Sequence, residues 1–165
     1  MKLLYYNAYI LPIFDYCCHI WGKNNQSYVK KVSALQNRAA RIILRKPKRS
    51  PSNGLIENLK WLCFNDRCKY HCATLVYKIL NGLAPCYLKD LITIANNNRY
   101  SLRSATKQDL VLNGAPRTSY YKQSFSYYGM TIWNEIPIDI RNSKSLQSFK
   151  IRYKSHLSKG SSLRK

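Results

Sequence analysis

The stretch Tyr28–Lys46 reads YVKKVSALQNRAARIILRK and decides the fold class. Pro47 and Pro51 follow it, and proline ends a helix because it lacks the backbone N–H. The stretch therefore predicts an amphipathic helix that packs one face against neighbouring helices. Its apolar side chains recur at the spacing of one helix face, and they are Val29, Val32, Leu35, Ala39, Ile42 and Ile43.

Basic residues form a stripe beside this apolar face, at intervals of seven, three and four residues. The loop after the helix adds two more positive charges, and no acidic residue occurs from position 23 to position 49. A solvated helix face normally mixes both signs of charge, so the pattern favours contact with phosphates over a merely solvated surface. The expected nucleic-acid-binding residues are Lys31, Arg38, Arg41, Arg45, Lys48 and Arg49.

Most of the remaining sequence also favours helices. Residues 2–21 are dense in apolar and aromatic side chains and predict a largely buried helix, or two helices that meet at Pro12. The polar stretch at 95–99 marks a boundary, and 109–114 is compatible with a short strand and a turn. Further helices are predicted over residues 55–62, 65–80, 85–92, 120–134 and 145–157.

These patterns predict a mainly α protein. We expect a helical bundle over residues 1–94 and a smaller, mostly helical segment over 95–158, in which short strands are compatible with the sequence. A flexible basic tail is expected at 159–165, since serine and basic residues dominate there.

The overall charge indicates a polyanionic partner. Lys and Arg total 28 against 7 Asp and Glu, which gives a formal net charge of +21. The positive residues lie along most of the chain, which favours nucleic acid over an anionic membrane, while a basic but solvated surface stays the alternative. The amino-terminal residues predict neither a signal peptide nor a membrane span. We expect an intracellular protein, nuclear or cytoplasmic and not secreted, with reduced cysteines and no membrane partner.

The sequence predicts no catalytic, metal or cofactor site. The closest approach to a metal motif is Cys63, Cys68, His71 and Cys72, but this spacing matches no zinc finger or knuckle, so buried thiols are the favoured interpretation. The seven acidic residues are scattered, and no two adjoin to hold a pair of metal ions or to act as an acid–base pair.

A series of short motifs, in order along nearly the whole chain, resembles the region after the polymerase core of non-LTR (LINE-type, jockey-like) retrotransposon reverse transcriptases. Each motif is short, and their combination in this order carries the resemblance. The shared residues are Leu3, Ala8, Leu11-Pro12, Asp15-Tyr16-Cys17, Trp21-Gly22, Leu35–Ile43, Leu59–Leu62, Arg67, Tyr77–Pro85, Tyr87-Leu88, Leu102-Arg103, Pro116–Thr118, Ser124–Tyr127, Trp133-Asn134, Ile136-Pro137, Ser145 and Ser148–Lys150.

The resemblance implies a thumb-like bundle and the segment that follows it. The thumb of such enzymes holds the template–primer duplex, so RNA–DNA or DNA duplex and the fingers and palm of a parent polymerase are the implied partners. The paired aspartates of an RNA-directed DNA polymerase are absent from this sequence. We therefore expect a non-catalytic fragment that binds template–primer through phosphates. The alternatives left open are a chain cut from an active enzyme, and an inactive relic or interaction module with no independent activity.

Overall fold

The computed structural model describes residues 1–22, 26–52, 54–92, 109–111 and 118–162. Over these residues the protein is mainly α-helical and has no β-strand, which confirms the predicted fold class. The chain divides into two compact units, Met1–His71 and Cys72–Lys165, which are described separately. The expected boundary at 95–99 lies outside the described residues.

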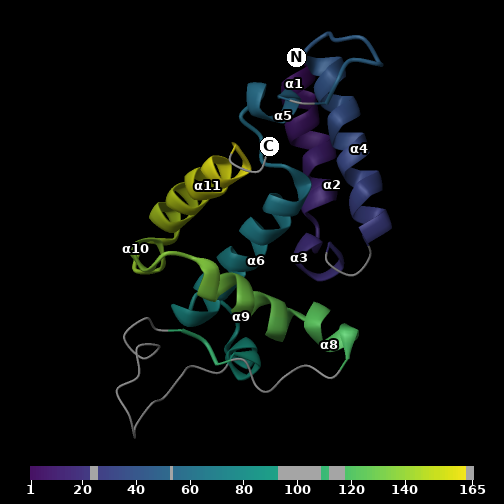
Figure 1. The fold of residues 1–165 in the computed structure, drawn as a ribbon. Helices are drawn as coiled ribbons and strands as arrows, with labels where there is room; N and C mark the ends of the chain where they lie inside the picture. Colours follow the sequence, from purple (N-terminus) through teal and green to yellow (C-terminus); the bar gives the residue numbers. More distant parts are fainter. Residues whose placement is uncertain (23–25, 53, 93–108, 112–117, 163–165) are drawn as a thin grey trace, which may run out of the picture. The chain divides into compact units, whose positions relative to one another are not determined.

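A helical rod opens the first unit and passes through Pro12 without a break (Figure 1). Its middle is π-helical, since the Leu11 N–H bonds to the carbonyl of Tyr6, five residues back. Pro12 then lies in the first turn of the next helical segment, where its missing N–H leaves no bond unmade. The predicted interruption at Pro12 is therefore wrong, because the widened turn accommodates the proline. The rod consists of α1 (Lys2–Tyr5), η1 (Tyr6–Ile10) and α2 (Leu11–Asp15).

The break comes instead at Cys17, whose φ of 49° lies in the left-handed region. The short helix α3 (Cys18–Trp21) follows, and the Trp21 indole donates a hydrogen bond of 2.7 Å to the Tyr16 carbonyl. Gly22 ends α3 under a steric constraint. A Cβ on Gly22 would lie 2.5 Å from the Cys68 sulfur and would also clash with the Cys18 carbonyl oxygen.

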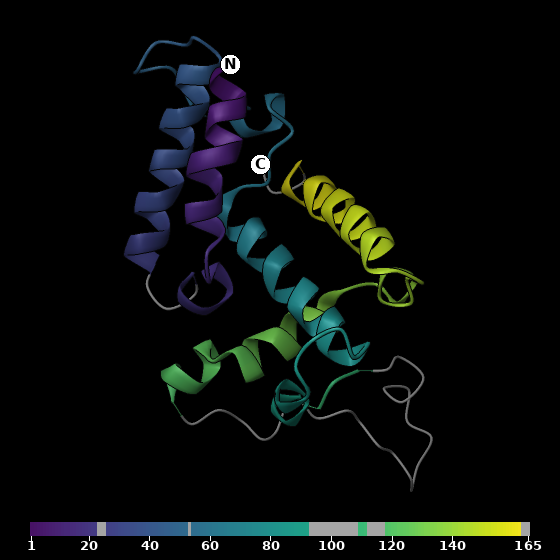
Figure 2. The same ribbon diagram turned by 180° about the vertical axis from the view of Figure 1, so that it is seen from behind.

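The predicted amphipathic helix is present as α4 (Gln26–Ile43) and lies antiparallel to the rod (Figures 1 and 2). Its buried face contains Val29, Gln36 and Ala40, and Gln36 is satisfied there because its Nε2 donates to the Leu62 carbonyl at 2.9 Å. Burial of Gln36 turns the preceding Leu35 outward. Leu35 and Ile42 are 51% and 52% exposed, so their predicted place on the packed face is wrong.

The core of the first unit forms where α3, α4 and α6 (Phe64–Leu80) meet. It is built on Cys18, Val29, Phe64 and Cys68, with Trp21 stacked on Phe64 at a centroid distance of 5.3 Å. A second contact ties the rod to the segment after the short helix α5 (Leu55–Asn58), because the Tyr6 ring stacks on Trp61 at 4.3 Å.

Most of the apolar surface of the rod is nevertheless uncovered. Tyr6 is buried, but Tyr9, Ile13 and Tyr16 are 65%, 70% and 77% exposed. The expectation that residues 2–21 are mostly buried is therefore wrong. Their apolar density exceeds what the neighbouring α4 covers, since one partner helix shields one face of a rod.

The second unit is centred on the carboxy-terminal half of α6. Tyr77 stacks on Phe149 at 4.6 Å and lies 6.4 Å from Trp133, and its hydroxyl donates to the Ser143 carbonyl at 2.7 Å. Gly129 allows close packing, because a Cβ there would stand 3.2 Å from Val76. The other elements are η2 (Cys86–Leu91), α8 (Ser119–Gln123), α9 (Phe125–Glu135), α10 (Ile138–Arg141) and α11 (Leu146–Ser162).

Of the stretch 109–114, which is compatible with a short strand and a turn, the structure describes residues 109–111, and Leu110 forms an isolated β-bridge. The N–H and carbonyl of Leu110 both pair with the Asn134 side chain at 2.9 Å, while Arg141 pairs with Asp109 at 2.7 Å. Residues 112–114 lie outside the described part of the chain. α11 extends to Ser162 and so includes the first residues of the tail expected at 159–165. Each helix in the described ranges is too short or too polar to cross a lipid bilayer.

Candidate functional site

The surface of α4 carries the predicted basic residues. Lys31 and Arg38 are exposed, and a separation of seven residues places them about 10 Å apart along one side of the helix. The Lys31 ammonium lies 5.6 Å from the centre of the Tyr28 ring. The exposed Leu35 and Ile42 lie among these cations, so the surface alternates positive and apolar side chains.

Arg41 differs from its neighbours because it is half-buried and bonded to the protein itself. Its Nε donates a 3.0 Å hydrogen bond to the Ser50 carbonyl. Ser50 closes the turn in which it lies, since its N–H and its hydroxyl both donate to the Pro47 carbonyl, at 3.0 and 2.7 Å. Arg41 therefore holds the turn that presents the exposed Lys48 and Arg49.

Arg45 lies just beyond the end of α4 and is exposed. Its φ of 54° is in the left-handed region, and the next N–H, of Lys46, bonds back to the Arg41 carbonyl at 2.9 Å. This bond satisfies one of the carbonyls left open at a helix end. The left-handed residue turns the chain away from the helix axis and into the basic turn.

Five of the six predicted residues thus reach solvent, and the sixth, Arg41, is half-buried and orders the turn. In the described ranges, no salt bridge joins any of the six to a carboxylate. Their charge is therefore not neutralised by ion pairs among these residues, and the surface attracts anions. We name this surface, made of Lys31, Arg38, Arg45, Lys48 and Arg49, the basic surface.

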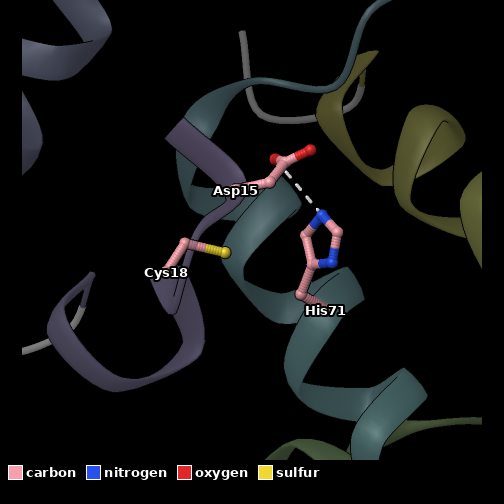
Figure 3. Close-up of side chains that lie close together, drawn as sticks. All are labelled: Asp15, Cys18 and His71. Atoms are coloured by element: carbon pink, nitrogen blue, oxygen red, sulfur yellow. Dashed lines mark ion pairs between the residues drawn. The ribbon is translucent and has the colours of Figure 1, made fainter. Parts of the chain in front are cut away.

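A second cluster of polar side chains lies inside the first unit, and sequence analysis missed it (Figure 3). Oxygen, sulfur and nitrogen atoms of Asp15, Cys18 and His71 lie within 4.8 Å of one another. Asp15 comes from the end of α2, Cys18 from the start of α3 and His71 from α6. The sequence separates His71 from the other two by more than fifty positions, so neither periodicity nor local spacing relates them.

The carboxylate of Asp15 is held from two sides. Arg67 contacts both of its oxygens, through Nε and Nη2, and His71 Nε2 lies 3.2 Å from Oδ1. Burial opposes ionisation of Asp15, but the contacts with His71 and Arg67 and their positive charges outweigh it and lower the pKa to about 2. Asp15 is therefore charged at neutral pH.

The thiol of Cys18 is completely buried. A hydrogen bond with the Cys68 side chain is the main cause that lowers its pKa to about 5, and burial opposes this effect while His19 and the charge of His71 support it. A thiolate favours metal binding or nucleophilic attack. Attack on a substrate requires access that a buried sulfur lacks, and His71 Nε2 faces Asp15, so the arrangement does not support a nucleophilic site.

The residues considered as a metal motif from their spacing, Cys63, Cys68, His71 and Cys72, have different partners in the structure. His71 belongs to the cluster and Cys68 hydrogen-bonds with Cys18, whereas the Cys63 thiol donates to the Asp66 carboxylate at 3.1 Å. A repeated spacing was the available signal, because Asp15-x-x-Cys18 and Cys68-x-x-His71 both pair ligand-type residues three positions apart.

Comparison of the chain with protein-family models, with curated proteins and with solved structures finds no match.

Proposed function

We propose that the chain binds a nucleic-acid duplex, RNA–DNA or DNA, through contacts between the basic surface and the phosphate backbone. The observation that carries this proposal is the exposure of five cations on α4 and its following turn, with no salt bridge to a carboxylate among the described residues. Phosphate contacts give affinity and position on the duplex and carry no base sequence information. The resemblance to the thumb region of non-LTR reverse transcriptases favours a template–primer duplex as the nucleic acid that the chain binds.

The alternating character of the surface supports a duplex over a small anion. Cations spaced along about two turns of helix and into the turn that follows it contact several phosphates at once. The exposed Leu35 and Ile42 between them suit the apolar parts of the sugars. Catalysis is not part of the proposal, because the paired aspartates of a polymerase are missing from the sequence.

The test is binding of a fluorescently labelled primer–template duplex at several salt concentrations. If the basic surface contacts four or five phosphates, log affinity falls against log salt with a slope of about −4. Sequence changes in the duplex leave the affinity unchanged, since bases are not read. An affinity that is indifferent to salt contradicts the proposal.

A charge-matched pair of variants locates the contacts. Lys31→Gln, Arg38→Gln and Arg45→Gln together are expected to reduce the magnitude of the salt slope by about 3. The control replaces the exposed Lys144, Lys154 and Lys159 of the second unit by Gln and removes the same charge. If the control weakens binding as much as the first variant, general charge and not the basic surface is responsible.

The second candidate is an interaction module. It is favoured by the exposed apolar side chains of the rod and of the residue that follows it, above all Tyr9, Ile13 and Tyr16. Exposed apolar patches of this kind mark association surfaces. Light scattering separates the candidates: association that Tyr9→Ser and Ile13→Ser abolish, in a chain that does not bind duplex, favours the module.

A further inference from the structure

The cluster of Asp15, Cys18 and His71 has a fourth ligand-type residue beside it, because the Cys68 side chain hydrogen-bonds with Cys18. Asp15 and Cys18 flank the left-handed turn at Cys17, which joins α2 to α3. Cys68 and His71 lie one turn apart on α6 and therefore share a face of that helix. Two pairs of ligands, each within a short span of chain, are the usual construction of a structural zinc site.

We propose that Asp15, Cys18, Cys68 and His71 bind one zinc ion that fastens α2 and α3 to α6. The four side chains offer two sulfurs, one imidazole nitrogen and one carboxylate oxygen, a set that zinc accepts in tetrahedral geometry. The proposal does not depend on nucleic-acid binding, and it revises the expectation of no metal site, which considered sequence spacing alone.

The distances agree with such a site. In tetrahedral zinc, bonds of about 2.0–2.3 Å hold the ligand atoms roughly 3.5 Å apart. Asp15 Oδ1 and His71 Nε2 are 3.2 Å apart, and the Cys18 sulfur lies within 4.8 Å of a carboxylate oxygen of Asp15 and a ring nitrogen of His71. The Cys68 side chain hydrogen-bonds with Cys18. The Cys68 sulfur lies outside the group of atoms within 4.8 Å of one another, so its side chain must turn toward the other three ligand atoms to complete the site.

His71 supplies an independent sign of a ligand. Its Nε2 is buried, and although it lies 3.2 Å from the Asp15 carboxylate it makes no well-directed hydrogen bond. A buried nitrogen of this kind ordinarily has a partner, and coordination to a metal provides one.

The charges of the cluster also balance with zinc present. Two thiolates and a carboxylate carry three negative charges, and zinc together with the Arg67 guanidinium carries three positive ones. Arg67 grips the Asp15 carboxylate and so orients it, as residues behind a metal ligand commonly do.

Burial of the two sulfurs favours a structural site over a catalytic one, while the side chains of Asp15 and His71 are 21% and 30% exposed. Cys18 and Cys68 are 0% and 4% exposed, and structural zinc sites are closed to solvent. Gly22 keeps α3 close to the Cys68 sulfur, since a Cβ at this position would meet that sulfur at 2.5 Å.

The first experiment uses the full chain, reduced and freed of metal, and titrates it with zinc alone against a coloured chelator. One zinc per chain is expected. X-ray absorption of the zinc form should show two sulfurs at about 2.3 Å and two nitrogen or oxygen atoms at about 2.0–2.2 Å. This measurement needs no variant, so it decides the ligand set even where substitutions prevent folding. A wild-type chain that binds no zinc, or binds it through no sulfur, overturns the proposal.

Variants then assign the ligands. Cys18→Ser, Cys68→Ser and His71→Gln are each expected to weaken zinc binding by about 100-fold or more, and Arg67→Gln by about tenfold. Cys86→Ser is the control, because this thiol is exposed and belongs to another unit, and it should leave zinc affinity unchanged. Loss of zinc in Cys86→Ser overturns the assignment. A Cys18–Cys68 disulfide that forms equally fast with and without zinc also overturns it.

Discussion

The Nε of Arg41 donates a hydrogen bond to the backbone carbonyl of Ser50 at 3.0 Å, and this bond ties the basic turn to α4. Arg41, which is expected to contact nucleic acid, thus has a structural role. The same side chain supplies positive charge and sets the position of Lys48 and Arg49, two of the other cations.

Replacing Arg41 by Gln should lower the free energy of unfolding by about 1 kcal/mol, the usual contribution of a hydrogen bond of this kind. Trypsin should also cleave faster after Lys48 and Arg49, because the turn that carries them is released. Urea denaturation and timed proteolysis measure the two effects. Arg38→Gln is the control, since the exposed Arg38 should change stability by less than about 0.5 kcal/mol.

A substitution at Arg45 should change the stability of the chain and its duplex binding in opposite directions. Its φ of 54° is strained for a residue with a Cβ, so Arg45→Gly should raise the free energy of unfolding by about 1 kcal/mol while weakening duplex binding. Lys60 also has a φ of 54°, outside the basic surface, and Lys60→Gly should stabilise equally without changing binding. Equal effects of both variants on duplex affinity contradict the assignment of Arg45.

Asp15 predicts an acid transition of the first unit. Its pKa is about 2 in the folded chain and 3.8 as a free group, so it stabilises the fold above pH 3.8 and loses this contribution as pH falls toward 2. The difference corresponds to on the order of 2 kcal/mol, from the 1.36 kcal/mol carried by each pKa unit. Asp15→Asn should lower stability at neutral pH and flatten the fall between pH 4 and about 2.

Denaturation with urea at a series of pH values makes this measurement. Asp90→Asn serves as the comparison, because Asp90 is exposed. An acid transition of unchanged size in Asp15→Asn excludes Asp15 as its source.

Substitution of alanine for glycine should lower the stability of the chain at one position and raise it at another. Gly22→Ala places a methyl group 2.5 Å from the Cys68 sulfur and is expected to cost about 1–3 kcal/mol of stability. Gly160→Ala, in α11, meets nothing within 4 Å and should stabilise by up to about 1 kcal/mol, because alanine favours a helix. Thermal melting of both variants checks the signs. A tolerated Gly22→Ala contradicts the close approach of α3 to α6.

Expectations based on local pattern succeeded where local forces decide the outcome. Helical spacing located α4, because a helix repeats every 3.6 residues and its apolar positions show this period. The failure at Pro12 was also local in origin. Proline usually breaks a helix, but here a π-helical turn precedes Pro12 and lets the helix continue. The residue types do not indicate this turn.

Which face of α4 is packed was not a local matter. Apolar periodicity placed Leu35 and Ile42 inside, whereas a hydrogen bond to the Leu62 carbonyl made the polar Gln36 a buried residue. That partner lies twenty-six positions away. The exposure of Tyr9 and Ile13 has a similar reason. A high density of apolar residues predicts burial, but burial occurs only where another segment packs against them.

The sequence by itself determined the helical class, the strong positive charge and the cations of the basic surface, because propensity, periodicity and charge belong to neighbouring residues. Tertiary structure alone gave Arg41 its task in the turn and brought Asp15 and Cys18 to His71. The physical reason is distance along the chain. The contact between α2, α3 and α6 depends on how the helices pack around a shared core. The residue pattern of one segment does not show which other segment will pack against it.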